Sequence, residues 1–299
     1  MNDLSVTYCG STIVTWSSIG TKTLQTSGTY CTDNISIIYN FSSITMPEDK
    51  LFSGRRSSGI YSNSTVTTLG VYALCNFDTI SSVNFSKCTT ISQYALSACT
   101  KIQTAIFPSC VTIGSYAFWN DSKLTTISFP KCKTISTDAF RGCSGLTSIY
   151  FPLVTTIWGT AFASCNGLTT IQSTDLPVCS SIPNQAFYKC TGLLTVTMPA
   201  LSNIYTAFQL CDHISMISFP KGSMVGSSAF SGCVRLTKLY LTNSSVAKLS
   251  NSNAFTSTPI GGYSTTAGTF GSIYVPSSLL TSYKASTNWT YFSSRFVSV

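Results

Sequence analysis

The side chains with the most obvious chemical potential are thirteen cysteines and a single histidine, His213. Thiolates bind zinc, and they act as nucleophiles where a base or a metal lowers the thiol pKa. No C-x-x-C pair occurs, and one histidine cannot complete a zinc site of the usual kind. Separations of 11 and 22 residues recur between successive cysteines, which indicates a repeat rather than metal-ligand spacing. We expect buried structural thiols, with disulfides, a redox role or metal binding as the alternatives.

Catalytic constellations are equally scarce. A Cys211–His213 dyad can be drawn, but Cys211 occupies a repeated apolar position, so its thiol should point into a core and away from the imidazole. The acidic residues of the repeats lie in turns of different units, not in the close pairs that acid–base catalysis uses. No phosphate-binding loop, dinucleotide fingerprint or nucleophile elbow is present. The sequence therefore predicts no enzyme, no cofactor and no metal site.

Composition narrows the class of partner. Of the 299 residues, 43% are hydrophobic but only 9% are charged, and the net charge of +8 reflects scarce acids. Lysine and arginine are spread out, with no run longer than Arg55-Arg56, so we expect no nucleic-acid partner and favour a mildly anionic glycan or cell surface. No 18-residue apolar stretch exists, which argues against membrane insertion. The first five residues lack the features of a secretory signal, which predicts synthesis in a cytoplasm.

An internal repeat organises most of the chain. Alanine followed by Phe or Leu recurs at intervals of 21, 22 or 25 residues, starting at Ala73, Ala95, Ala117, Ala139, Ala161, Ala186, Ala207, Ala229 and Ala254. A cysteine stands four residues after most of these alanines, and apolar residues follow at seven, ten and twelve residues. Units this short cannot bury an apolar face alone, so neighbouring units must stack around one continuous core.

Each unit predicts one short strand. The segment 124–129 ends with Ile127 and Phe129 inward and polar residues between them, and a proline then ends the strand. Copies of this strand would form a parallel sheet on one wall, with strands roughly 4.8 Å apart. The apolar spacing from Ile135 to Cys143 predicts a single helical turn on the opposite wall. The expected fold class is a repeat solenoid of the α/β leucine-rich-repeat type, with turns or short helices facing the sheet.

The pattern I-x-F-P-x-x-x-x-I-x-x-x-A-F-x-x-C-x-x-L, present from Ile127 to Leu146, resembles the BspA-type leucine-rich repeats of bacterial and protozoan surface proteins. The resemblance covers roughly residues 69–296, and the segment from Ile273 to Trp289 is similar to that family's usual ending. It implies a non-enzymatic protein of adhesion or recognition, whose ligand differs between members.

We divide the chain into four parts: a β-rich module (1–40), an irregular first rung with an insertion (41–68), the repeats (69–255) and a C-terminal capping segment (256–299). The module predicts strands at Leu4–Tyr8, Thr12–Trp16 and Ile35–Tyr39. The stretch from Gly20 to Cys31, with the strand after it, resembles small β modules in tail or fibre proteins of phages that infect gut bacteria. That resemblance implies an attachment point, and a plain β-rich cap is the alternative.

Both flanks of the repeats carry further expectations. The first rung contains a degenerate strand at Ile44–Pro47 and a loop rich in Ser, Gly and Arg from Ser53 to Ser64. In the capping segment, Ser277 or Ser278 could cap a short helix. Tyr283 and Trp289 would then cover the last rung, because a solenoid otherwise exposes its core at the end.

The outward face of the predicted sheet is the candidate ligand-binding surface. Its polar and aromatic positions are Asn84, Thr126, Ser128, Ser148, Tyr150, Thr170, Gln172, Thr195, Thr197, Ser218, Lys238, Tyr240 and Tyr274. Amides and hydroxyls beside aromatic rings suit sugars or protein loops, since rigid amphipathic side chains bind at low entropy cost. A face that is merely solvated is the alternative.

The leading hypothesis is a virion or tail-associated component that recognises a glycan or protein on a bacterial surface. It would be made in the host cytoplasm and attached to other virion proteins through residues 1–40. The alternative is a bacterial or protozoan adhesin, at the cell surface or extracellular, that binds host matrix or glycans. Either protein could form a homo-oligomer. The third hypothesis is a hydrolase or thiol enzyme whose activity depends on His213.

Overall fold

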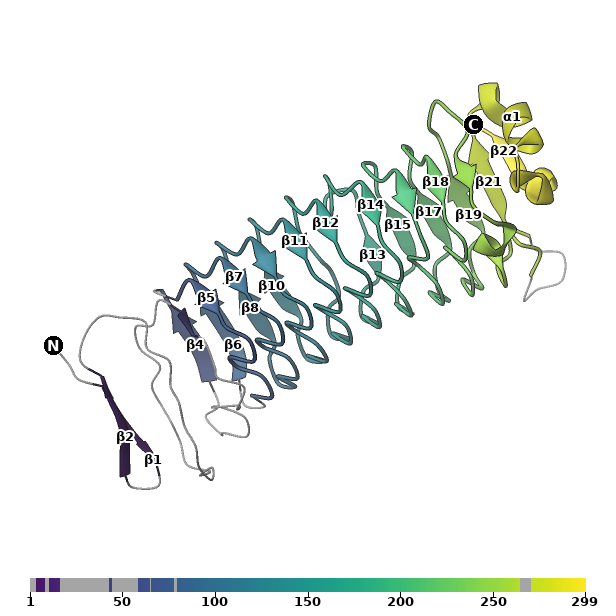
Figure 1. The fold of residues 1–299 in the computed structure, drawn as a ribbon. Helices are drawn as coiled ribbons and strands as arrows, with labels where there is room; N and C mark the ends of the chain where they lie inside the picture. The colour runs from purple at the N-terminus through teal and green to yellow at the C-terminus, as the bar shows by residue number, and fades with distance from the viewer. Residues whose placement is uncertain are drawn as a thin grey trace.

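The chain is an elongated coil of stacked rungs, which confirms the solenoid fold class (Figure 1). The computed structural model describes residues 66–77, 80–263 and 270–299 with their side chains, and 4–8, 11–16, 43–44 and 59–64 mainly as backbone. Each rung passes in turn through a first wall of strands, a second wall of shorter strands and a third wall of tight turns.

The first wall is a parallel ladder in two sections. One section holds β4 (Gly59–Asn63), β6 (Ile80–Phe85), β8 (Thr104–Ile106) and β10 (Thr126–Ser128). The other holds β13 (Thr170–Ile171), β15 (Thr195–Thr197), β17 (Met216–Ser218), β19 (Lys238–Tyr240), β21 (Ser272–Val275) and β22 (Phe296–Ser298). Equivalent residues of successive rungs pair in register, as Ile217 does with Leu239. This wall is the predicted sheet.

The second wall is a ladder that the sequence pattern did not predict. Its members are β3 (Ser43–Ile44), β5 (Thr68–Leu69), β7 (Thr90–Ile91), β9 (Thr112–Ile113), β11 (Thr134–Ile135) and β12 (Thr156–Ile157), then β14 (Ser181–Ile182), β16 (Asn203–Ile204), β18 (Met224–Val225) and β20 (Lys248–Leu249). Strands of two residues leave no alternation to detect in a sequence. Only their repetition along the coil makes them a sheet.

The third wall consists of tight turns, so the predicted helical turn from Ile135 to Cys143 is wrong. Six-residue turn segments recur at 71–76, 93–98, 115–120, 137–142, 159–164, 184–189 and 227–232. Two residues per segment adopt left-handed backbone angles, for example Tyr116 (φ 58°) and Asn120 (φ 61°). A left-handed residue ends helical geometry, and here the N–H of Phe118 donates to the carbonyl of Ala139 in the next rung. Hydrogen bonds between rungs therefore replace those of a helix.

The core is built from files of identical side chains. Phe118, Phe140 and Phe162 stack almost parallel, with ring centroids 5.1 and 5.3 Å apart. Phe107 and Phe129 belong to a second file that meets the first edge-on. All five rings are buried. Each large side chain is packed by its own copies above and below, as expected where units contact only their neighbours.

Both ladders are interrupted, in neighbouring rungs. On the first wall, Ser148 and Tyr150 lie outside any strand, and Phe151 donates its N–H to Asp175 within a three-residue insertion of the next unit. On the second wall, Pro183 stands where other rungs donate an N–H to the rung before, as Trp158 does to Ile135. Proline has no N–H, so the ladder breaks between β12 and β14.

The N-terminal expectations are met in part. β1 (Leu4–Tyr8) and β2 (Ser11–Trp16) form an antiparallel pair, whereas the expected strand at Ile35–Tyr39 lies outside the described residues. β3 and β4 extend both ladders by one rung, in the part of the chain where we predicted an irregular first rung. β4 corrects the predicted loop from Ser53 to Ser64, because Gly59–Asn63 pairs with β6 and gains a ladder of backbone hydrogen bonds.

The C-terminal segment caps the last rung, at the yellow end of the coil in Figure 1. It contains two short 3₁₀ segments (Ser277–Leu279 and Trp289–Arg295) and helix α1 (Leu280–Ala285), and another 3₁₀ segment (Ser252–Phe255) comes directly before it. Tyr283 and Trp289 are fully buried, and the indole N–H donates to the carbonyl of Ala247 at 2.6 Å, which confirms their covering role. The predicted serine cap is wrong, because the Ser277 hydroxyl donates to the carbonyl of Val299 and α1 has no side-chain cap.

One buried residue does not fit its file. Asp121 occupies the position that other rungs give to cysteine, between Cys99 and Cys143, and it is fully buried. Among the described residues, neither oxygen of its carboxyl group has a hydrogen-bond partner of good geometry. Burial raises the pKa of this carboxyl well above its usual value, and the nearby backbone N–H of Cys99 offsets only part of that rise. Burial therefore favours the protonated form of Asp121 in the folded chain.

Replacing Phe140 with Ala should destabilise the fold by about 3–5 kcal/mol, because a cavity would open between the rings of Phe118 and Phe162. Urea unfolding followed by circular dichroism measures the change. Ser144→Ala, on an exposed residue of the same rung, is the matched control and should shift the midpoint little. Equal shifts in the two variants would contradict the role of the phenylalanine file.

Replacing Asp121 with Cys should stabilise the fold at pH 7 by about 1–3 kcal/mol, because it removes an unsatisfied buried polar group and restores the file. The wild type should also lose stability as pH rises above about 4, where the unfolded state releases the Asp121 proton and the folded state keeps it. This slope should be absent in Asp121→Cys. Melting curves from pH 4 to 8 measure both effects, and parallel pH profiles for the two proteins would refute the assignment.

Candidate functional site

The predicted binding residues lie on the outward face of the first wall, but not as one continuous surface. None of them is buried. Asn84, Thr126 and Ser128 belong to the N-terminal section of the wall, on β6 and β10. Three exposed residues lie where the first wall is interrupted: Ser148, Tyr150 and Gln172. The remaining seven, Thr170, Thr195, Thr197, Ser218, Lys238, Tyr240 and Tyr274, follow β13 to β21.

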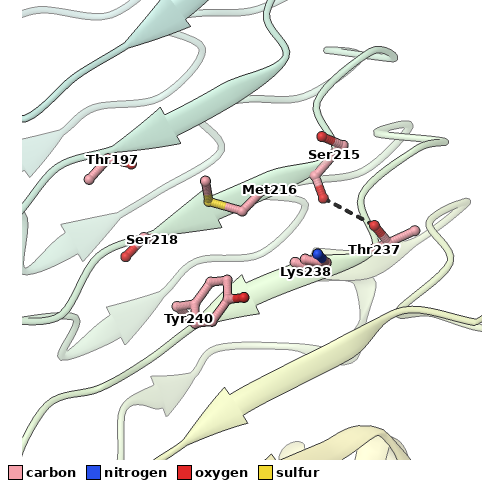
Figure 2. A pocket seen from close by; sticks show the side chains of 7 residues that line it. All are labelled: Thr197, Ser215, Met216, Ser218, Thr237, Lys238 and Tyr240. Carbon is pink, nitrogen blue, oxygen red and sulfur yellow. Dashed lines mark hydrogen bonds between the residues drawn. The ribbon is translucent and has the colours of Figure 1, made fainter. Parts of the chain in front are cut away.

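Four of these residues gather around a shallow depression of about 650 Å³ on β15, β17 and β19. Its lining consists of Thr197, Ser215, Met216, Ser218, Thr237, Lys238 and Tyr240, all drawn in Figure 2. Ser215, Met216 and Thr237 were not among the predicted residues. Ser215 and Thr237 each lie one residue before a strand. Their equivalent positions in the repeat could have predicted that they lie beside the sheet. The Thr237 hydroxyl donates to the carbonyl of Ser215 at 3.3 Å.

A pair of stacked tyrosines borders this depression. The rings of Tyr240 and Tyr274 lie 4.5 Å apart at an angle of 12°, because β19 and β21 pair in register. Each ring limits the movement of the other, so the Tyr240 side chain is already ordered beside Lys238 and Met216. A ligand that binds it therefore loses little side-chain entropy. Hydroxyls, one ammonium group and an aromatic ring can bind a polar ligand. The residues that line the depression include no carboxylate or imidazole for proton transfer.

The third wall carries a tyrosine ladder that the sequence pattern did not predict. Tyr72, Tyr94 and Tyr116 stack at 4.9 and 4.6 Å, each at the left-handed position before the repeat alanine. In the next rung this position holds Asp138, which pairs with Arg141 at 3.3 Å. The negative charge of Asp138 and its hydrogen bond with Tyr116 raise the pKa of that phenol. Because the rings cover each other's faces, the ladder stabilises the wall.

The thiols are structural, as expected from their spacing. The eleven cysteines of the described region are buried and free of disulfides. In the file that follows the repeat alanines, each thiol donates to a carbonyl of the preceding rung, as Cys143 does to Phe118 and Cys165 to Phe140. Burial raises the pKa of Cys190 and Cys233 to about 12. A thiol in that environment is neither a nucleophile nor a metal ligand at neutral pH.

The Cys211–His213 dyad does not form. The Cys211 thiol is buried and donates to the carbonyl of Phe187 at 2.9 Å, and burial raises its pKa well above the usual value. His213 instead contacts the carboxylate of Asp212 at 2.9 Å, on a side chain that is 41% exposed. The imidazole therefore faces solvent, away from the thiol of Cys211.

Metal clusters and membrane-spanning helices are both absent from the described residues. In that part of the chain, no group of three or more His, Cys, Asp or Glu side chains could hold a metal ion. No helix within it is both long and apolar enough to cross a bilayer.

The buried thiols predict a clear pattern of reactivity. In the native protein, none of the eleven described cysteines should be open to alkylation with iodoacetamide. They should react only when urea unfolds the chain, because their thiols are buried. Intact-mass spectrometry counts the modified thiols. Rapid native modification of more than two of the thirteen thiols would contradict the described core.

Comparison with known proteins agrees with this architecture. The model for "BspA type Leucine rich repeat region" matches residues 18–147 and 133–261, with six copies. No curated protein matches the chain. Similar solved structures include a leucine rich cell surface protein of Faecalibacterium prausnitzii (19% identity, 73% of this chain and 67% of that one, TM-score 0.39). Another is a leucine rich repeat protein of T. pallidum (20% identity, 66% of this chain and 79% of that one, TM-score 0.42). A third is the pneumococcal vaccine antigen PcpA (13% identity, 81% of this chain and 87% of that one, TM-score 0.29). Because the family model matches well over half of the residues of this chain, the chain belongs to the BspA-type leucine-rich repeat family.

Proposed function

We propose that this protein is a non-enzymatic adhesin that acts at a cell surface and binds host matrix or host glycans. We place its ligand on the first wall, over β15, β17, β19 and β21. The single observation that carries the proposal is the depression beside the stacked pair Tyr240–Tyr274, on a wall that is otherwise polar and nearly uncharged. Membership of a repeat family whose members serve in adhesion and recognition supports it.

The chemistry of this surface supports binding over catalysis. Lys238 supplies one positive charge, which suits the mildly anionic glycans and matrix proteins of a host surface. Tyr240 supplies a ring that is held in place by Tyr274. Thr197 and Ser218 supply hydroxyls on neighbouring rungs, and these donate to and accept from polar ligands.

A virion or tail-associated location, with residues 1–40 as the attachment point, is the weaker proposal. The family model matches residues 18–147 and 133–261, so it reaches into the module, and it describes a leucine-rich repeat and gives no support to a tail or fibre module. The surface adhesin therefore takes precedence. The two proposals differ in the cell that is bound, since an adhesin binds host material and a tail component binds bacteria.

The test is binding of the purified chain to immobilised extracellular-matrix proteins, mammalian cell glycans and whole gut bacteria, followed by biolayer interferometry. Tyr240→Ala should weaken binding to the matrix or glycan ligand by about 2 kcal/mol or more, as expected for a central aromatic contact. Lys238→Ala should weaken it less, and mainly at low salt.

Two variants serve as controls for this experiment. Thr126→Ala alters the same face on β10, far from the depression, and His213→Ala alters the single imidazole; both should bind as the wild type does. Loss of binding in Thr126→Ala but not in Tyr240→Ala would place the ligand elsewhere. Binding to bacteria alone would favour the virion proposal, and binding to no surface would overturn both.

A further inference from the structure

The second wall carries two exposed aromatic rings, with a half-buried proline between them along the coil. The position that follows each short strand holds a small residue in most rungs: Gly70, Ser92, Gly114, Ser136, Gly226 and Ser250. In three consecutive rungs the same position holds Trp158, Pro183 and Tyr205. Trp158 is 55% exposed and Tyr205 is 40% exposed. The change from small residues to rings begins at the rung where the first wall is interrupted and ends at Tyr205, in a rung whose strands are paired on both sides.

The backbone fixes the two outer residues of this row, one on each side of the break between β12 and β14. Trp158 donates its N–H to Ile135 at 2.9 Å and Tyr205 donates to Ile182 at 3.3 Å, so both residues are fixed by the ladder. β14 pairs with β16 in register, and β12 packs beside β14. Pro183 therefore lies between Trp158 and Tyr205 along the coil, and the paired strands β14 and β16 are roughly 4.8 Å apart.

A polar row runs beside the rings. Thr156, Ser181 and Asn203 stand two residues before Trp158, Pro183 and Tyr205, and side chains two apart on a strand share a face. The Asn203 amide is already oriented, because its oxygen accepts from the Ser223 hydroxyl and its nitrogen donates to the Ser202 hydroxyl. Hydroxyl and amide groups therefore line one side of the rings.

The patch is neutral and has charged borders. The second-wall segments 153–160, 178–185 and 200–206 contain no Asp, Glu, Lys, Arg or His. The rung before them carries Lys133 and the rung after them carries Lys221, both exposed. Removing water from a charged group without a partner is costly, so a neutral strip favours an uncharged ligand.

The small size of the row favours a small ligand over a protein partner. A stable protein interface buries about 800 Å² per partner and uses roughly 20–30 residues a side. Three rings bounded by Ser136 and Gly226 form a much smaller platform. A pyranose presents a flat apolar face that stacks on an aromatic ring, and its hydroxyls lie at the edge where a polar row can reach them. A β-1,4-linked chain is extended and repeats these flat units at a spacing close to that of the rungs.

We propose that Trp158, Pro183 and Tyr205 form a binding site for an uncharged, extended β-1,4-linked glycan that lies along the coil axis. The rings stack on successive sugar units, while Thr156, Ser181 and Asn203 hydrogen-bond their hydroxyls. This site lies on the second wall, so it is separate from the depression on the first wall and does not depend on the function proposed for it.

The test uses the full chain and three uncharged β-1,4-linked hexasaccharides, of glucose, mannose and N-acetylglucosamine, in isothermal titration calorimetry. At least one should bind the wild type and change its tryptophan fluorescence. Trp158→Ser, which installs the residue found at Ser136, should lower the affinity at least tenfold and abolish the fluorescence change. Tyr205→Ser should also lower the affinity, and Trp158→Phe should retain most of it.

Matched controls separate this site from others. Tyr291→Ser removes a ring that is 74% exposed in the C-terminal cap, and Tyr240→Ala removes the ring of the first wall; both should bind the sugar as the wild type does. Binding of none of the three sugars, or equal binding by Trp158→Ser, would overturn the proposal. Loss of sugar binding in Tyr240→Ala would also overturn it, and would move the glycan to the first wall. Conversely, if Tyr240→Ala leaves matrix and cell binding intact while Trp158→Ser loses the sugar, only the first-wall function fails.

Discussion

The contact of each side chain with its own copy in the next rung is the interaction on which this structure depends. Phe140 packs between Phe118 and Phe162 at close to van der Waals distance, and the rings are parallel within a few degrees. The thiols form a similar file, in which the carbonyl that accepts the S–H belongs to the rung before. No single rung could bury these groups, so the apolar interior exists only because the rungs are in register.

Register in the core fixes register on the surface. Inward residues hold each rung in place, and the outward positions are then free to vary without cost to the fold. The first wall uses this freedom for polar groups and the Tyr240–Tyr274 pair, and the second wall uses it for the row from Trp158 to Tyr205. The interruption at Pro183 and Asp175 is tolerated because the inward residues continue through it, as the stacking of Phe162 on Phe187 shows. A solenoid of this kind offers several independent surfaces on one scaffold.

Much of the fold follows from the sequence, because burial repeats with the same period as the chain. The position of Ile127 on a strand, the burial of Phe129 and Cys143 and the covering role of Trp289 are all confirmed, although the strand ends at Ser128, before Phe129. The second wall could not be predicted, since Thr134–Ile135 is too short to show a pattern. The third wall forms turns rather than a helix because the tertiary hydrogen bonds of Phe118 and its copies outweigh local preference.

The candidate site was predictable only as a face. Alternation places Thr197 and Tyr240 outward, but the depression depends on how three rungs lie beside one another, and that includes Ser215 and Thr237 from outside the strands. The row on the second wall was invisible for the same reason, because Trp158 and Tyr205 are 47 residues apart in the chain and are related only through the rungs.

Native-state hydrogen exchange of the backbone amides tests the register most directly. The N–H groups of Phe118, Phe140 and Phe162 each donate to a carbonyl of the next rung, so they should exchange slowly and with similar protection. Protection that is uniform along this file is the predicted result. Exchange within seconds at any of the three, while the strands remain protected, would contradict the stacked core.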